Sequence, residues 1–192
     1  NKALPHFVNE PDISRLLDQC KFTDDFLGKR DQLIMELLYG TGIRLSELIN
    51  LKGSDINFRA QTIKVLGKRN KERVIPFSKS LGLLIATYQT KKNNSVSSNE
   101  GDYLLVTENG EQCYAMLIYR TVKKYLNLFT TIEKRSPHVL RHTFATHLLN
   151  KGAELNAVKD LLGHTSLAAT QVYTHNSLDK LKTVFDQAHP KA

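Results

Sequence analysis

The chain has 192 residues, 41% of them hydrophobic, a size that suits one cored domain with a short extension and argues against a second full domain. Its 27 basic and 19 acidic residues give a net charge of +8, which favours a polyanionic partner such as nucleic acid without requiring one. No long apolar run and no signal-like start appear, so we expect a cytoplasmic protein without a membrane partner. Cys20 and Cys113 are far apart in sequence and indicate neither a disulfide framework nor a zinc site.

The first nine residues are predicted to form an interdomain linker, because prolines precede the first amphipathic run. The domain proper is expected to begin near Glu10, in a helix with Ile13, Leu16 and Leu17 on its apolar face. A chain that opens in a linker indicates that an upstream domain is absent from it. Apolar residues at helical spacing over 33–38 predict a second helix, which the GTG of residues 40–42 ends, and a third begins near Leu45.

Residues 55–77 change to β-branched segments, INF, TIKVL and RVIPF, with GKRNK between the last two. This pattern predicts a small antiparallel sheet. Ser78 or Ser80 is a suitable cap for the following helix. The polar run KKNNSVSSNEGD, residues 91–102, is predicted to be a flexible surface loop.

The second half of the chain is predicted to be helical. We expect a helix over 115–129 and another from Pro137, capped by Ser136, to about Lys151. Gly152 and Gly163 each suit the position after a helix end, and further helices are expected near 166–174 and 178–188. The predicted fold class is mainly α with a small antiparallel β-sheet.

Polar and charged residues gather in three segments where a packed core would not require them: TGIRLSEL, LGKRNKER, and HVLRHTFATHLL continuing to LLGHTSLAATQVYTH. Arg44 follows the TG turn, and Lys68 lies in the predicted hairpin 24 residues later, with Arg69, Lys71 and Arg73 as neighbours that could take its place. A spacing of three places His138 and Arg141 on one helix face. Each of these residues, taken singly, has an ordinary structural explanation. For Tyr173, in the third segment, that explanation is a half-buried position in the core.

Together these segments resemble the tyrosine recombinases of the phage integrase family, and most closely the bacterial Xer type, over nearly the whole chain. The resemblance implies a tyrosine recombinase catalytic domain at residues 10–176, with the upstream core-binding domain absent. It also implies a catalytic set in which Tyr173 is the nucleophile. That set is Arg44, Lys68, His138, Arg141, His164 and Tyr173.

The chemistry of phosphate esters agrees with these residue types. Guanidinium groups donate paired hydrogen bonds to phosphate and stay charged, so Arg44 and Arg141 can neutralise the charge that develops during attack. By resemblance, Tyr173 forms a 3′-phosphotyrosine, Lys68 is the general acid, and His138 and His164 bind the phosphate. We expect no cofactor, no metal and no ATP.

The resemblance implies double-stranded DNA at a specific recombination site as the partner, bound by a homo- or hetero-tetramer. Residues 177–192 carry an apolar stripe that we expect to dock in trans on a neighbouring protomer: Leu178, Leu181, Val184 and Phe185. Packing on its own domain is the alternative.

Other interpretations remain open. Within the recombinases, Xer-type chromosome-dimer resolution in the bacterial nucleoid is favoured over integration or excision of a mobile element. A type IB topoisomerase and a non-catalytic DNA-binding module are weaker alternatives. A metal site at His138, His142 and His147 is weaker still, because no acidic or cysteine ligand lies in that segment. Glu47, three residues after Arg44 on the same helix, either holds that region or pairs with a nearby cation, or is an ordinary surface glutamate, and it stays outside the catalytic set.

Overall fold

A computed structural model describes residues 7–67, 72–97 and 101–163, together with residues 179, 182–183 and 185–186 of the C-terminal segment. The predicted fold class is confirmed, since the described residues form mainly helices and one three-stranded antiparallel sheet. The elements in chain order are α1 (Glu10–Gln19), α2 (Phe26–Thr41), α3 (Leu45–Ile49), the 3-10 helix η1 (Gly53–Asp55), β1 (Ile56–Asn57), β2 (Thr62–Leu66), β3 (Glu72–Pro76), α4 (Lys79–Ser95), α5 (Ala115–Phe129), α6 (Pro137–Asn150) and α7 (Leu155–Leu161). Among these helices, none is long and apolar enough to cross a membrane.

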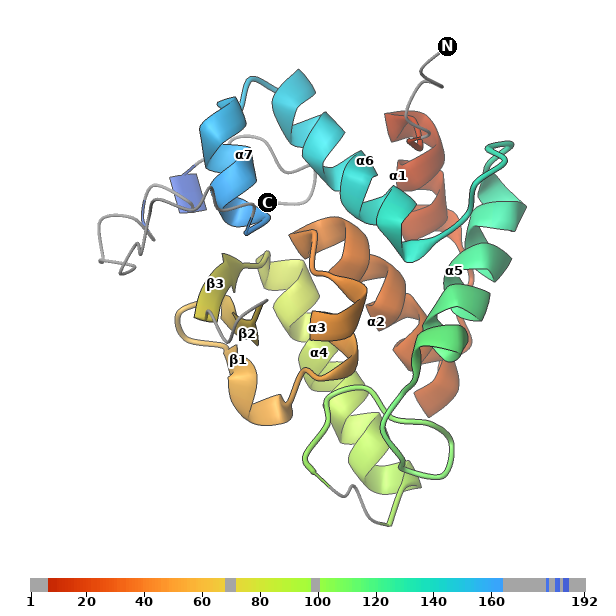
Figure 1. Cartoon of the computed structure of the whole chain (residues 1–192). Helices are drawn as coiled ribbons and strands as arrows, with labels where there is room; N and C mark the ends of the chain where they lie inside the picture. Colours follow the sequence, from red (N-terminus) through yellow and green to blue (C-terminus); the bar gives the residue numbers. More distant parts are fainter. Residues whose placement is uncertain are drawn as a thin grey trace.

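Helix α2 lies at the centre of the molecule, with α4, α5 and α6 packed around it and the sheet beside α3 and α4 (Figure 1). It begins where Asp25 accepts a hydrogen bond from the Gly28 N–H. It ends at Gly42, which has φ 62°. A Cβ at Gly42 would lie 2.5 Å from the Phe144 ring of α6, so glycine allows both the left-handed turn and the close approach of α6. The predicted break in the GTG therefore falls at its second glycine.

The sheet has the order β1-β2-β3, with Ile63 opposite Ile56 on one side and Ile75 on the other. Its β2–β3 register pairs Leu66 with Glu72, so the two strands form a hairpin. The alternation along β3 places Arg73 and Ile75 on the same, buried face. A charged side chain is thus directed into the protein from this strand.

The loop predicted over 91–102 is partly wrong, because α4 continues to Ser95 and Lys92 is buried within it. The Lys92 ammonium donates to the carbonyl oxygens of Tyr103 (3.0 Å) and Leu104 (3.4 Å) and lies over the Tyr88 ring. Burial lowers the pKa of this lysine, and Asp102 opposes that effect. The polar run gave no sign of these partners, which come from a later segment of the chain.

Residues 7–9, within the predicted linker, pack against α6. The Val8 side chain is fully buried, and its N–H donates to Thr143 Oγ1 at 3.0 Å. The Val8 carbonyl lies 2.9 Å from His147 Nε2, and Tyr39 Oη lies 3.0 Å from His147 Nδ1. Because a carbonyl can only accept, Nε2 carries the hydrogen and Nδ1 accepts from Tyr39 in the neutral ring. His147 therefore has a structural role, joining the incoming chain to α2 and α6.

Protonation of His147 is expected to destabilise the fold. Burial lowers the pKa of His147 below its ordinary value of 6.5, and the Val8 hydrogen bond and Glu10 only partly offset it. The folded state then binds fewer protons than the unfolded state, so stability falls as the pH drops through 6.5 toward the lowered pKa. We expect the melting temperature to fall over this range, and to fall less in His147→Gln. His142→Gln, at an exposed position of the same helix, serves as the control and should keep the wild-type pH dependence. An unchanged pH profile in His147→Gln would contradict the assignment.

The described part of the C-terminal segment, residues 179, 182–183 and 185–186, is helical, within the helix predicted near 178–188. Phe185 is buried in this single chain, and the Lys182 ammonium donates to the Ala60 carbonyl before β2. Leu178, Leu181 and Val184 of the predicted stripe lie outside the described residues, as does the helix predicted near 166–174. At Phe185 the packing is within the chain itself.

Candidate active site

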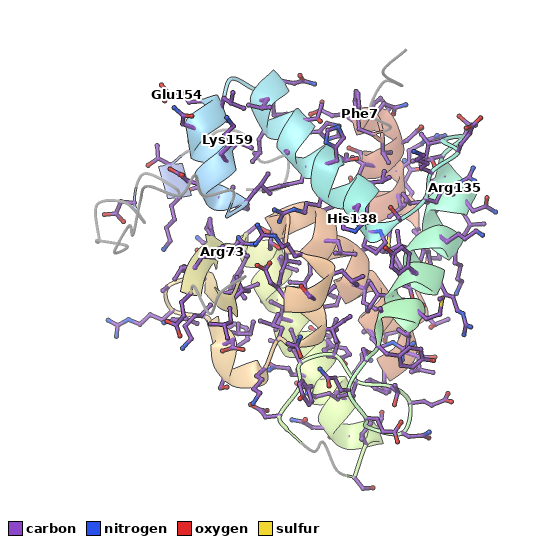
Figure 2. The ribbon with its side chains drawn as sticks, viewed as in Figure 1. Phe7, Arg73, Arg135, His138, Glu154 and Lys159 are labelled. Atoms are coloured by element: carbon purple, nitrogen blue, oxygen red, sulfur yellow. The ribbon has the colours of Figure 1, made fainter. Side chains whose placement is uncertain are left out.

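Helix α6 carries two of the predicted catalytic residues. Pro137 occupies its first turn after Ser136, as the sequence predicted. His138 is exposed at the start of the helix (Figure 2), and Arg141 is half-buried one turn later. The Arg141 guanidinium donates through Nη1 to the Gly42 carbonyl and through Nη2 to the Leu162 carbonyl at 2.6 Å. Arg141 thereby ties α6 to the end of α2 and to the end of α7.

Arg44 lies two residues after the left-handed turn at Gly42 and is the N-cap residue of α3. Its backbone N–H donates to Glu47 Oε2 at 2.8 Å, and its Nη1 donates to Glu47 Oε1 at 2.9 Å. Its Nη2 donates to the Gly163 carbonyl at 2.8 Å. Glu47 thus holds both the backbone and the side chain of Arg44.

Arg73 reaches the same carboxylate from β3. Its Nη2 donates to Glu47 Oε2 at 2.7 Å, its Nε lies 3.3 Å from Glu47 Oε1, and its Nη1 donates to the Leu161 carbonyl at 2.6 Å. Exposure separates the two arginines: the side chain of Arg73 is 5% exposed and that of Arg44 is 25% exposed. Figure 2 shows Arg73 at the end of β3 that faces α7.

Three successive carbonyls at the end of α7 each accept a hydrogen bond from a different arginine. Leu161 binds Arg73, Leu162 binds Arg141 and Gly163 binds Arg44. The last carbonyls of a helix have no partner within it and carry partial negative charge, so guanidinium groups satisfy and stabilise them. Gly163 has φ 68°, and a Cβ there would lie 2.8 Å from Arg73 Cδ. Glycine therefore makes room for this arrangement.

The cluster has an excess of positive charge. Counted over the described residues, three guanidinium groups against one carboxylate, Glu47, leave a formal +2 (3 − 1 = 2). Burial, with repulsion from Arg44 and Arg73, lowers the pKa of Arg141 to about 10, while Glu47 opposes this effect. Burial alone would raise the pKa of Glu47, but the charges and hydrogen bonds of Arg73 and Arg44 outweigh it and hold the pKa below its ordinary value. Both shifts leave Glu47 and Arg141 ionised at neutral pH, and an anion placed beside the arginines would relieve their repulsion.

Three of the six predicted site residues lie in the described structure. It brings Arg44 and Arg141 together at the end of α7 and places His138 at the start of α6. The other three, Lys68, His164 and Tyr173, lie outside the described residues.

The sequence analysis left Glu47 and Arg73 out of the catalytic set. Two signals were available: the spacing of three from Arg44 to Glu47, and the position of Arg73 on the inward face of a strand, two residues before Ile75. Neither signal shows that the two side chains meet. Their pairing depends on how β3 packs against α3.

The described residues contain no group of three or more His, Cys, Asp or Glu side chains that could hold a metal ion. An open pocket of about 730 Å³ lies elsewhere, between α5 and the start of α2. Its lining mixes both signs of charge, with Arg30 and Lys124 beside Asp31, and contains none of the predicted site residues. The arginine cluster is therefore the candidate site.

Comparison with known proteins identifies the family of the chain. The sequence model of the phage integrase family matches residues 6–179, so the chain belongs to the phage integrase family. It is 36% identical over 211 residues to the tyrosine recombinase XerC of Chlorobaculum tepidum and 42% identical over 189 residues to that of Staphylococcus carnosus. All of this chain is covered in the first match and 98% in the second, and the chain spans 63% of the length of each relative.

Solved structures show the same fold. The XerA recombinase superposes with a TM-score of 0.74 at 28% identity, covering 100% of this chain and 68% of that one. The XerH site-specific recombinase, in a post-cleavage complex with its difH substrate, superposes with a TM-score of 0.76 at 26% identity, covering 94% of this chain and 52% of that one. The fold is that of the tyrosine recombinase catalytic domain.

Proposed function

We propose that the chain is the catalytic part of a site-specific tyrosine recombinase that cuts and rejoins DNA strands. The observation that carries the proposal is the convergence of Arg44 and Arg141 on adjacent carbonyls at the end of α7. They come from different helices, yet both guanidinium groups lie in one cluster with a formal charge of +2. A phosphodiester carries one negative charge and gains another as a fifth oxygen bonds to phosphorus. The positive charge of the cluster balances that developing negative charge.

The proposed reaction conserves the energy of the phosphoester bond. The Tyr173 hydroxyl attacks the phosphorus, the bond to the 5′ oxygen breaks, and a 3′-phosphotyrosine forms. Lys68 supplies the proton that the leaving 5′ oxygen requires, and His138 or His164 accepts the proton of the tyrosine. Attack of a 5′-hydroxyl on the phosphotyrosine reverses these steps and joins the strands. Because Arg44 and Arg141 supply the charge that a divalent cation otherwise provides, the reaction needs neither metal nor ATP.

Exposure at this site supports a DNA partner. His138 is exposed at the start of α6, where the helix dipole favours an anion, and Arg44 is 25% exposed. Of the five N–H groups of a guanidinium, the described hydrogen bonds use two in Arg44. A phosphate approaching the end of α7 can bind the others while the backbone carbonyls keep both arginines in place.

The XerC relatives favour Xer-type recombination, and thus resolution of chromosome dimers, over integration of a mobile element. In this proposal the protein acts on the bacterial chromosome in the cytoplasm, as a homo- or hetero-tetramer on DNA. The tetramer forms through residues 177–192, with release of the segment around Phe185 from its own domain before it docks in trans. In this proposal an upstream core-binding domain supplies the rest of the DNA clamp.

Covalent capture tests the proposal. The chain is incubated in EDTA with nicked duplexes of randomised sequence, which trap a cleaved strand because the fragment beyond the nick diffuses away. We expect a protein–DNA adduct that survives detergent, and sequencing of the captured strands should give one recombination site. Tyr173→Phe, which lacks only the nucleophilic oxygen, should form none. No adduct with the wild type, or an undiminished adduct with Tyr173→Phe, would refute the proposed function.

A further inference from the structure

Arg73 is the most deeply buried cation of the arginine cluster. It lies on the inward face of β3, and its side chain is 5% exposed against 25% for Arg44. Burying a guanidinium is costly unless it is paired and hydrogen-bonded. Arg73 satisfies both conditions, with two contacts to Glu47 and one to the Leu161 carbonyl. Its burial places it behind Arg44, away from a phosphate bound at the surface.

The contacts of Arg73 connect it to Arg44 through one shared carboxylate. Glu47 Oε1 accepts from Arg44 Nη1 and lies 3.3 Å from Arg73 Nε, while Glu47 Oε2 accepts from the Arg44 backbone N–H and from Arg73 Nη2. Each carboxylate oxygen therefore contacts both residues. If Arg73 were removed, Arg44 would be the one remaining cation on Glu47 among the described residues, and Glu47 is what fixes the Arg44 guanidinium.

Arg73 also joins two segments that flank predicted catalytic residues. It lies five residues after Lys68 in sequence, and it binds the Leu161 carbonyl, three residues before His164. Arg73 Cδ would meet a Cβ at Gly163 at 2.8 Å, so the end of α7 fits closely around the side chain. One buried guanidinium thus links β3, α3 and the end of α7.

We propose that Arg73 is a positioning residue for DNA strand cleavage: it does not bind the scissile phosphate, but holds Glu47, and through it Arg44, against the end of α7. This inference rests on the proposed recombinase activity. The planar guanidinium of Arg73 contacts two oxygens of Glu47 and a backbone carbonyl at the same time. A lysine has one ammonium nitrogen and a different shape, so its charge alone cannot replace Arg73.

The test compares single-turnover adduct formation on two DNAs with the captured sequence. One has an ordinary scissile phosphate, and the other has a methylphosphonate, which lacks the negative charge. We expect Arg73→Met to slow adduct formation by about 100-fold on phosphate DNA. The reason is that a small displacement of the Arg44 guanidinium from the reacting phosphate has an effect of this size. DNA affinity should change by less than about 3-fold, since the phosphate contacts themselves remain. On methylphosphonate DNA, where neutralisation by Arg44 matters less, the loss should shrink to about 10-fold or less.

Arg30→Met is the matched control. Arg30 is also a largely buried arginine, with a side chain 12% exposed that contacts Asp31 and the Val106 carbonyl, but it lies outside the cluster. Arg30→Met should change the rate of adduct formation by the same factor on both DNAs, once the rates are corrected for the folded fraction. Arg73→Lys should recover only part of the rate on phosphate DNA.

Glu47→Gln/Arg73→Met covers the case in which Arg73→Met does not fold. The double variant removes both members of the buried ion pair, so it should fold and show the same selective loss on phosphate DNA. Equal losses on both DNAs, or wild-type cleavage by either folded variant, would overturn the role of Arg73 alone. Absence of an adduct with the wild type would overturn the recombinase activity, and with it this role.

Discussion

Arg141→Ala is expected to slow formation of the covalent DNA adduct by about 100- to 1,000-fold, the usual effect of removing one preorganised charge donor from a transition state. Arg141 contributes one of the three guanidinium groups that give the cluster its formal charge of +2. Its bonds to the carbonyls of Gly42 and Leu162 fix it before the substrate arrives. Arg141→Lys keeps the charge but not the planar fork that spans both carbonyls, so we expect an intermediate rate.

The same substitution should cost little folding stability. Burial and repulsion from Arg44 and Arg73 both disfavour the charged form of Arg141, as its lowered pKa shows. Loss of two hydrogen bonds to carbonyls is therefore partly offset by relief of that repulsion. Single-turnover rates and thermal melting, measured together, separate the two effects. Arg120→Ala, which removes one exposed positive charge from α5, is the control and should change neither. A melting temperature that falls in proportion to the lost activity would identify Arg141 as structural instead.

Glu47→Gln, unlike Arg141→Ala, is expected to cause a large loss of folding stability. The Glu47 side chain is 1% exposed and is the counter-ion of both Arg44 and Arg73. Neutralising it breaks the buried ion pair with Arg73, which contacts both carboxylate oxygens, a change that typically costs about 3–5 kcal/mol. Urea unfolding at neutral pH measures the difference.

Two further variants test this explanation of the Glu47→Gln effect. Glu72→Gln removes a carboxylate from the same strand as Arg73, but its ion pair with Lys64 is 3.6 Å long and largely exposed. We expect this control to change stability by less than about 1 kcal/mol. Adding Arg73→Met to Glu47→Gln should restore much of the loss, because both members of the buried ion pair are then absent. A Glu47→Gln protein as stable as the control would show that Arg73 does not depend on this carboxylate.

Much of the fold could be predicted because local signals coincide with the elements. Ile13, Leu16 and Leu17 of α1 are buried as their spacing indicated, and Pro137 begins α6. The left-handed glycines at 42 and 163 likewise end α2 and α7. The prediction failed at Lys92, where a polar run suggested a loop. Its partners are carbonyls at Tyr103 and Leu104, and no pattern within α4 indicates them.

The sequence by itself determined the class of protein and predicted which residues react, because each of the six predicted residues lies in a short motif of its own. Only the tertiary structure decided how the charges are arranged: it joins Arg44, Arg73 and Arg141 to three successive carbonyls of α7 and places Glu47 between the first two. The physical reason is that helix and strand periodicity specifies which side of an element a residue faces, whereas a buried ion pair depends on two elements meeting. Arg44 and Arg141 were recognisable from their motifs, whereas the meeting of Arg73 with Glu47, which holds Arg44, was not.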